Sequence, residues 1–455
     1  MNFNNYIRNE FGKTDTPENT IRKIATGFDR LGYDIRYIPF QVADQIHWSQ
    51  VYINDINLQC QGKGLTPELA KASAHAELAE RFSGGLFFQD FEEQVRFNMP
   101  ALYSRHVNRF LNYEWLSGYV SSHQDDLKED HLPIETLLCK QSHLSPVNIE
   151  EIKNSQMARH WVDGYSVMRD KTVKVPINFI AYINASNGMA AGNTMEEALI
   201  QAACEVFERY TQIQIIKPEK RVPSIDKNSL KSSRLKSMIA FYESENVEII
   251  LKDFSMEARF PSIGVLFINH NLRPGRLEHK ILVPGVSFNM DEALSRCLTE
   301  IMQGRNTLEM PSPELDRPVS HRSRVENLYL FFKCCISQKD ISFLEDGDTI
   351  AYRNNKKKSI FSEIEAIKKI CHALETDFIV LDLTHPVLNF PVVRVVLPGI
   401  SDFLAFVHKD ILTSVDTRPD STWRGERFKH VMNSFFFTPP GKPEKARSGV
   451  VKSWQ

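Results

Sequence analysis

The sequence contains the same short acidic pattern twice. ELAERF occupies residues 77–82, and EVFERY occupies residues 205–210. Both read Glu-x-x-Glu-Arg-aromatic, and both lie in stretches that are otherwise rich in alanine or apolar residues. Side chains three or four positions apart share one face of a helix, so each copy predicts a helix that carries two carboxylates on one side.

The acidic copies extend into two longer predicted helices, over residues 66–83 and 194–216. Thr66 suits the N-cap of the first helix, and Pro67 suits its first turn. A third helix is predicted over residues 290–304. The polar stripe of the first helix consists of Ser73, Glu77, Glu80 and Arg81. The stripe of the second consists of Glu197, Gln201, Glu205, Glu208 and Arg209, and that of the third of Arg296, Glu300 and Gln303.

Composition describes an ordinary globular chain of 455 residues, with 42% apolar residues, 25% charged residues and a net charge of −2. This balance gives no general attraction to nucleic acid or to an anionic membrane. No stretch has the roughly 18–20 apolar residues of a membrane span, and the N-terminus lacks a signal-peptide pattern. The seven cysteines include no C-x-x-C pair. We therefore expect a cytoplasmic protein with reduced cysteines.

Strand-like runs alternate with helical patterns along the chain, which predicts an α+β or mixed α/β fold. Residues 120–160 have the polar pattern of an insertion or exposed connector, and residues 353–359 that of a loop before a helix. The predicted organisation is an N-terminal segment (1–48), a main domain (49–415) and a C-terminal tail (416–455). The strand-like runs are 48–55, two runs within 165–186 around VKVPINFIAYI (173–183), 247–254, 262–270, 377–383 and 390–399.

Each acidic stripe also has a simpler explanation, because charged stripes are usually solvated faces. Glu197 could close a capping box with Thr194, as Glu292 could with Asn289. Arg296 and Glu300 could form a surface i,i+4 pair worth about 0.3–0.5 kcal/mol. Two acidic copies on two small-residue helices favour a shared site over two independent coincidences.

A shared site needs a cation, since two unit charges about 4 Å apart repel by about 1 kcal/mol in water and about 4 kcal/mol at an effective dielectric of 20. Mg²⁺ fits, because it prefers oxygen ligands and bridges carboxylates to phosphates. Lys63 and the interleaved arginines would then meet phosphate. A di-iron site normally uses Glu-x-x-His, which neither copy has. Gly188 and Gly192 could admit a phosphate at the second helix, and the sequence has no Walker A or G-x-G-x-x-G motif.

Three segments together resemble the ATP-binding motifs of the YcaO family. They are GKGLTPELAKASAHAELAERFSGG (62–85), SNGMAAGNTMEEALIQAACEVFERY (186–210) and EALSRCLTEIMQGR (292–305). RVVLPGISDF (394–403) is similar to a further family segment, and the resemblance covers roughly residues 12–410. The chain is more similar to stand-alone members than to the fused cyclodehydratases of peptide natural-product clusters.

The resemblance implies a YcaO-type fold whose ATP site is formed by acidic helices packed on β-sheet. It indicates no catalytic residue. GKTDTPENT (12–20) is similar to a phosphate-contacting segment. The implied Mg²⁺ ligands are Glu77, Glu80, Glu205, Glu208 and Glu300. The implied ATP-contacting residues are Lys13, Thr20, Lys63, Ser73, Glu197, Arg209, Arg296 and Gln303.

Members of the family activate a backbone amide: a nucleophile adds to the carbonyl, and ATP phosphorylates the resulting oxygen. Loss of phosphate then gives an azoline, a thioamide or a related group. The resemblance thus implies a peptide or protein substrate and a recognition or sulfur-donor partner, and it is compatible with a homodimer. The chain ends in KSWQ and not in the Pro-x-Pro-x-Pro of many cyclodehydratases. Two alternatives remain, an ATP-binding accessory protein for an enzyme such as a ribosomal-protein methylthiotransferase, and a protein whose acidic stripes are merely structural.

Overall fold

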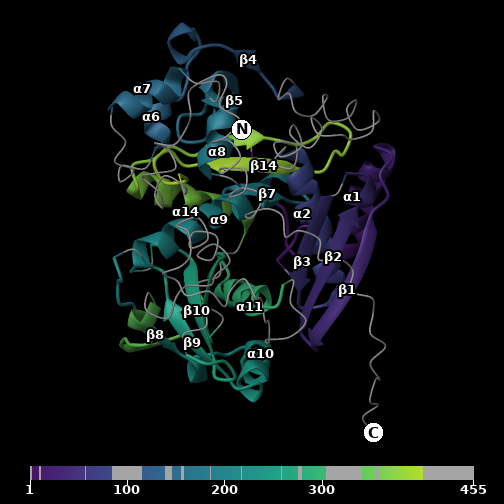
Figure 1. Ribbon diagram of the computed structural model, residues 1–455, viewed down its shortest axis with the longest axis vertical. Coiled ribbons are helices and arrows are strands. Elements are labelled where there is room, and N and C mark those ends of the chain that lie inside the picture. Colours follow the sequence, from purple (N-terminus) through teal and green to yellow (C-terminus); the bar gives the residue numbers. More distant parts are fainter. Residues whose placement is uncertain are drawn as a thin grey trace.

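The computed structural model describes residues 3–9, 12–84, 115–138, 146–154, 158–303 and 341–402, except 57, 185, 217, 258, 275–278 and 355–358. The predicted tail (416–455) lies outside these residues. The described part contains three β-sheets with helices packed on them (Figure 1). The predicted mixed α+β class is confirmed.

The first sheet holds the strands β1 (Arg36–Ala43), β2 (Ile46–Ile53) and β3 (Leu58–Gly64) in an antiparallel meander. The helices α1 (Pro17–Arg30) and α2 (Pro67–Ser83) share a core with this sheet. Figure 1 shows these elements together at one side of the molecule. Residues 48 and 49, where the first boundary was predicted, both lie inside β2. Strand β1 pairs with β2, and α1 shares its core with β2, β3 and α2.

Strand β3 lies unusually close to α2 because two of its residues are glycines. A Cβ atom at Gly62 would lie 2.1 Å from the backbone nitrogen of Ala74, and one at Gly64 would lie 2.5 Å from that of Ala70. Lys63 stands between them, and alternate residues of a strand point to opposite faces. The glycine face therefore contacts α2, while Lys63 points away from it. Thr66 caps α2 as predicted, accepting the Leu69 N–H at 3.2 Å.

We predict that Gly62→Ala lowers the free energy of unfolding by about 2–3 kcal/mol, because the added methyl group would overlap the α2 backbone. Chemical denaturation of wild type and variant measures the change. Gly32→Asn is the control, since no atom lies within 4 Å of a Cβ built at Gly32 and asparagine tolerates its φ of +81°. Equal stability of Gly62→Ala and wild type would contradict the close approach of β3 and α2.

The second sheet has the strand order β4 (Val120–Ser121), β5 (His160–Ser166), β13 (Ile379–Asp382), β14 (Val392–Val396) and β7 (Met189–Ala191), and β6 (Lys171–Pro176) pairs with β5. One face packs against α6 (Ile134–Leu137), α7 (Pro146–Asn154) and α8 (Ile177–Asn184). The opposite face packs against α9 (Met195–Ile216) and α14 (Ile360–Ala373).

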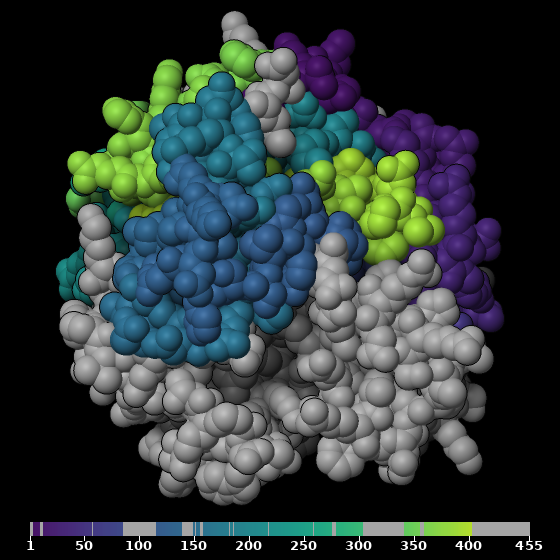
Figure 2. All heavy atoms as spheres, turned by 90° about the horizontal axis from the view of Figure 1, so that it is seen from above, coloured from purple at the N-terminus to yellow at the C-terminus, as the bar shows by residue number. Residues whose placement is uncertain are grey.

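Two sequence expectations in this layer are wrong. The run INFIAYI within residues 165–186 forms helix α8 and not a second strand; Phe179 and Ile180 are fully buried, and a continuous apolar run does not distinguish a strand from a buried helix. Of the two alternatives for residues 120–160, the exposed connector is wrong, because Ile134 and Leu137 belong to the core. The insertion stays a prediction. Figure 2 shows this blue segment gathered on one face of the molecule, beside the yellow-green part of the chain.

The third sheet has the order β11 (Lys280–Val286), β10 (Ser262–Asn269), β9 (Val247–Asp253), β8 (Ser224–Asp226) and β12 (Thr349–Ala351). The helices α10 (Ser233–Ser244) and α11 (Met290–Glu300) share a core with it. Its central strands β9 and β10 are the predicted runs 247–254 and 262–270. Helix α11 thus packs on a different sheet from α2 and α9.

The described part of the chain contains four of the seven cysteines. Cys60, Cys204, Cys297 and Cys371 are free thiols and are all buried. No helix among the described residues has the length and apolar character needed to cross a membrane.

Candidate nucleotide site

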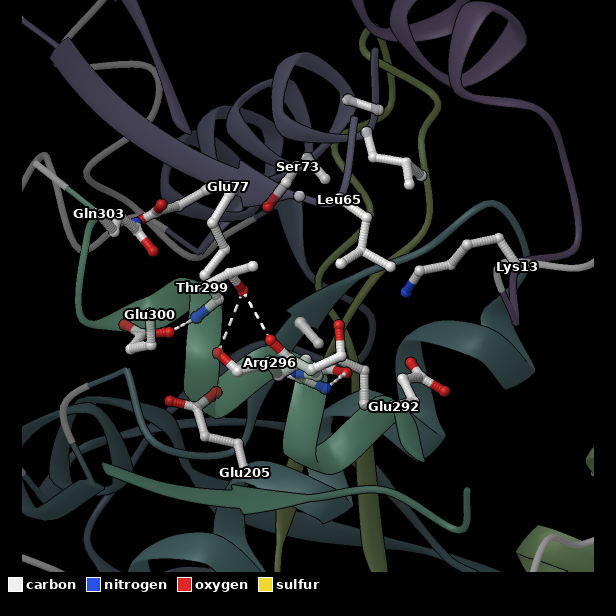
Figure 3. A pocket seen from close by; sticks show the side chains of 18 of the residues that line it. Lys13, Leu65, Ser73, Glu77, Glu205, Glu292, Arg296, Thr299, Glu300 and Gln303 are labelled. Carbon is white, nitrogen blue, oxygen red and sulfur yellow. Dashed lines mark hydrogen bonds and ion pairs between the residues drawn. The ribbon is translucent and has the colours of Figure 1, made fainter. Parts of the chain in front are cut away.

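The three predicted acidic helices meet at one cavity of about 960 Å³. Helix α2 contributes from the first sheet, α9 from the second and α11 from the third, and strand β3 and the N-terminal segment complete the walls. Every residue that the sequence assigned to Mg²⁺ or ATP lines this cavity: Lys13, Thr20, Lys63, Ser73, Glu77, Glu80, Glu197, Glu205, Glu208, Arg209, Arg296, Glu300 and Gln303. Of the two glycines suggested to admit a phosphate, Gly192 lines the cavity and Gly188 does not. Figure 3 shows side chains from these separate elements directed toward the same space.

Most of the carboxylates lie beside a cationic side chain. On α2, the Arg81 guanidinium lies 3.4 Å from the Glu77 carboxylate and 3.8 Å from that of Glu80. On α9, Arg209 lies 3.6 Å from Glu208. Lys63 of β3 forms an ion pair with Glu300 of α11. The protein therefore offsets part of the negative charge with its own residues.

The suggested surface pair of Arg296 and Glu300 is wrong. Arg296 Nη1 instead donates a hydrogen bond of 2.6 Å to Gln201 Oε1 on α9, and Glu300 pairs with Lys63. Gln303 Nε2 donates to the backbone carbonyl of Gln61 at 3.2 Å. These contacts tie α11 to α9 and to β3, so the stripe of the third helix joins elements and is not a solvated face.

Two carboxylates in the cavity wall lie where their charged form is disfavoured. Burial raises the pKa of Glu80, and the carboxylates of Glu205 and Glu77 raise it further, against the opposing effect of Arg81. Burial also raises the pKa of Glu205, with Glu208 adding to the effect and Arg209 and Arg81 opposing it. A cation that entered between α2 and α9 would relieve this repulsion, so the donor set fits a divalent metal such as Mg²⁺.

The carboxylates do not form a ready-made metal site. Within the described part of the chain, no group of three or more His, Cys, Asp and Glu side chains is placed to hold a metal ion. Oxygen ligands from α2, α9 and α11 line one cavity but remain spread over it and paired with arginine or lysine. A metal would have to draw them together, and Mg²⁺ commonly binds with only one or two carboxylates plus phosphate.

The N-terminal segment is fixed to α9 through Glu197. This carboxylate accepts the Thr14 N–H at 2.9 Å and the Thr14 hydroxyl at 2.5 Å, and it lies 3.8 Å from Lys13 Nζ. The Thr194 hydroxyl accepts the Glu197 N–H at 3.2 Å. In a capping box the Glu197 carboxylate would also accept the Thr194 N–H. Here the carboxylate accepts the two bonds from Thr14 instead. Burial alone would raise the pKa of Glu197, but Lys13 and Thr14 hold it below its ordinary value.

Two helix N-termini also meet at the cavity. Thr20 in the first turns of α1 lies with its hydroxyl 2.7 Å from Oδ1 of Asn193, just before α9. Gly192, Asn193 and Pro17 all line the cavity. Backbone N–H groups at helix N-termini favour anions, so this end of the cavity suits phosphate while the middle suits a cation.

A family model matches residues 61–401, and its description is YcaO cyclodehydratase, ATP- and Mg²⁺-binding. The chain belongs to the YcaO family. The match confirms the resemblance read from the three motifs, and it confirms ATP and Mg²⁺ as the expected cofactors of this domain.

Similar proteins and structures agree with YcaO membership. The ribosomal protein S12 methylthiotransferase accessory factor YcaO of Escherichia coli is 27% identical over 86% of this chain, and the chain spans 66% of that protein. The structure of YcaO from Methanopyrus kandleri bound with AMPPCP and Mg²⁺ matches with a TM-score of 0.56 at 18% identity, covering 88% of this chain and 96% of that one. A heterocyclase in complex with substrate and cofactor matches with a TM-score of 0.60 at 16% identity, covering 88% and 54%. These two likenesses show the fold.

The cavity of this YcaO domain has further lining residues that the sequence did not nominate. Asn193 and Asp15 lie at its phosphate-compatible end, and Glu292 lies in the first turn of α11. Lys231 precedes α10, and Arg234 lies in its first turn. Asn193 directly precedes the predicted N-cap, which was an available signal. The α10 residues had no comparable signal, because only the packing of α10 beside α11 brings them to the cavity.

We predict that the contacts of Glu197 stabilise the protein at neutral pH and are lost in acid. A carboxylate whose pKa is lowered by folding contributes stability above its unfolded pKa, and that contribution disappears as the pH falls through the folded value. The difference in unfolding free energy between wild type and Glu197→Gln should therefore be largest near pH 7 and shrink toward pH 3. Denaturant unfolding at several pH values measures it, and a difference that is constant with pH would contradict the assignment.

Proposed function

We propose that this protein uses Mg²⁺ and ATP to activate a backbone amide of a peptide or protein by O-phosphorylation. One observation carries the proposal: three separate helices place carboxylates around one cavity that also holds lysine and arginine side chains and two helix N-termini. A polyphosphate with a divalent cation has this distribution of charge. Family membership supports the same ligands.

We assign the metal to the middle of the cavity. Glu80 of α2 and Glu205 of α9 are partly buried carboxylates whose mutual repulsion a cation would offset. Glu77, Glu208 and Glu300 stand beside cationic partners at the same cavity. We propose that metal binding takes over part of these pairings, so that Arg81, Arg209 and Lys63 become available for phosphate.

We assign the phosphates to the end formed by α1, α9 and the N-terminal segment. Lys13 and Thr20 stand at this end, and Asn193 lies between them and the start of α9. Arg296, fixed by Gln201, faces the cavity from α11. Ser73 and Gln303 would bind other parts of the nucleotide.

The chemistry follows from the poor leaving ability of an amide oxygen. A nucleophile adds to the carbonyl carbon, and transfer of the γ-phosphoryl group to the resulting oxygen makes it a good leaving group. Bound Mg²⁺ would neutralise charge on the phosphates during this transfer. The protein's residues hold the phosphates and orient them. The product would be an azoline, a thioamide or a related group, and a partner could supply peptide recognition or sulfur.

A second candidate function is an ATP-binding accessory role for a protein-modifying enzyme. The observation that favours it is the name of the Escherichia coli relative, which is an accessory factor of a methylthiotransferase. The chain spans 66% of that relative, so the activity of the whole protein does not transfer directly.

We predict that ATP binds to the wild type only weakly without Mg²⁺ and at least about tenfold more tightly with it, because the cavity carboxylates repel an uncompensated triphosphate. Glu208→Gln should remove most of the Mg²⁺-dependent gain by deleting one metal ligand. Isothermal titration calorimetry measures both. The control is Glu68→Gln, which changes an exposed carboxylate in the first turn of α2 outside the cavity. An ATP affinity that is the same with and without Mg²⁺ would overturn the metal assignment.

We further predict that a library of short peptides increases phosphate release from ATP by the wild type, because the amide carbonyl is the phosphoryl acceptor. The rate of phosphate release with and without the library measures this, and Glu208→Gln with the library is the control. Tight Mg²⁺-dependent ATP binding with no increase in release by any peptide would favour the accessory role over the enzyme.

A further inference from the structure

Lys13 reaches the cavity from a segment before α1 whose described residues, 3–9 and 12–16, form no helix or strand, so its position depends on specific contacts. Its backbone is bonded in both directions to Asn9. The Lys13 N–H donates to Asn9 Oδ1 at 3.0 Å, and the Asn9 N–H donates to the Lys13 carbonyl at 2.7 Å. The side-chain amide of Asn9 (Nδ2) also donates to the Asp15 backbone carbonyl at 2.8 Å. One asparagine thus closes the turn on both sides of the lysine.

Arg8 fixes this turn to a distant helix. Its Nη1 donates to the Gly12 carbonyl at 2.8 Å, and its Nη2 donates to the Glu363 carboxylate at 2.5 Å. Glu363 lies in the first turn of α14 and is only 6% exposed. Gly12 has a φ of +76°, a conformation that favours glycine, and its carbonyl is the point at which Arg8 holds the turn. The turn is therefore fastened to α14, a helix that packs against α9.

The opposite side of the turn is fastened to α9 itself. Thr14 donates twice to Glu197, and the Asn4 N–H donates to Glu196 at 2.8 Å. Lys13 stands between these two attachments, and its side chain remains 39% exposed with Nζ directed into the cavity (Figure 3). A long flexible side chain binds phosphate well only if its backbone is held in place, because ordering it at the moment of binding costs free energy.

We propose that Arg8, Asn9 and Glu363 are positioning residues for Lys13, and that they hold its amine toward the phosphates of the bound nucleotide. This inference rests on the proposed function. None of the three residues lines the cavity, so each would act through the turn and not by touching the ligand. Glu363 lies 350 positions after Lys13 in the chain. It also lies outside the three motifs, the last of which ends at residue 305.

A double-mutant cycle tests the proposal. Mg²⁺-dependent ATP affinity is measured by calorimetry for wild type, Arg8→Ala, Lys13→Ala and the double variant. Lys13→Ala should weaken binding about tenfold, as expected for loss of a charged hydrogen bond, and Arg8→Ala about three- to tenfold. The double variant should bind no more than about twofold more weakly than Lys13→Ala alone, because Arg8 has no effect once the lysine is gone.

Two further variants and a control keep the result interpretable. Asn9→Ala and Glu363→Gln should weaken ATP binding in the same direction as Arg8→Ala, and thermal unfolding verifies that each variant is folded. Arg169→Ala is the matched control, because Arg169 pairs with Asp377 at 2.7 Å and neither residue lines the cavity. Its ATP affinity should equal that of wild type.

The possible results are distinct. Wild-type affinity in folded Arg8→Ala would overturn the proposal, and so would a double variant whose loss equals the product of the two single losses. An unchanged affinity in Lys13→Ala would also overturn it, because the lysine would then have no phosphate contact to position. Absence of ATP binding by the wild type would instead defeat the proposed function, and this inference with it, before any variant is compared.

Discussion

Repulsion between partly buried carboxylates is the constraint on which the arrangement of this protein depends. Glu80 and Glu205 approach each other from two helices, each in surroundings that disfavour its charged form. Burying such a pair costs free energy, and the protein does not remove that cost by substituting neutral residues. It places Arg81 and Arg209 beside the pair, which reduce the repulsion while leaving a cavity between the helices. A region that retains costly charge beside open space is suited to a ligand that brings the opposite charge.

The fold meets this constraint by keeping the three acidic helices on three different sheets. Each helix has its own hydrophobic core, so the acidic faces are held in place by apolar packing behind them and not by attraction to one another. The close contact of β3 with α2 shows the same division of roles. Gly62 and Gly64 allow backbone contact on one face of the strand, and Lys63 between them reaches Glu300 on α11 from the other face. Packing energy thus holds charges where electrostatics alone would drive them apart.

The sequence predicted the acidic helices well because their signals are local. Helical spacing placed Glu77, Glu80, Glu205 and Glu208 on single faces, and Thr66 marked the start of a helix. The hydrogen-bond and ion-pair partners of these polar side chains were less predictable, because they depend on which residues the tertiary fold brings close. Arg296 is four residues from Glu300, yet it bonds to Gln201 on another helix. The strand prediction for INFIAYI failed for a different reason. Most of the described side chains of α8 are buried, so the segment has no broad polar face and no helical period to detect.

The N-terminal turn lies at the limit of what local patterns can reveal. GKTDTPENT indicated that Lys13 and Thr20 belong near phosphate, and both line the cavity. Nothing in that stretch indicated the contact of Arg8 with Glu363, which is far away in sequence and lies in an otherwise ordinary amphipathic helix. A motif contains the residues that face a ligand, whereas the residues that hold them in place need only be near in space. An electrostatic site requires both kinds of residue. A mobile charged side chain must lose conformational entropy when it binds, and this loss offsets much of the attraction to its partner. The anchoring residues of such a site can therefore lie outside every motif and still control its affinity.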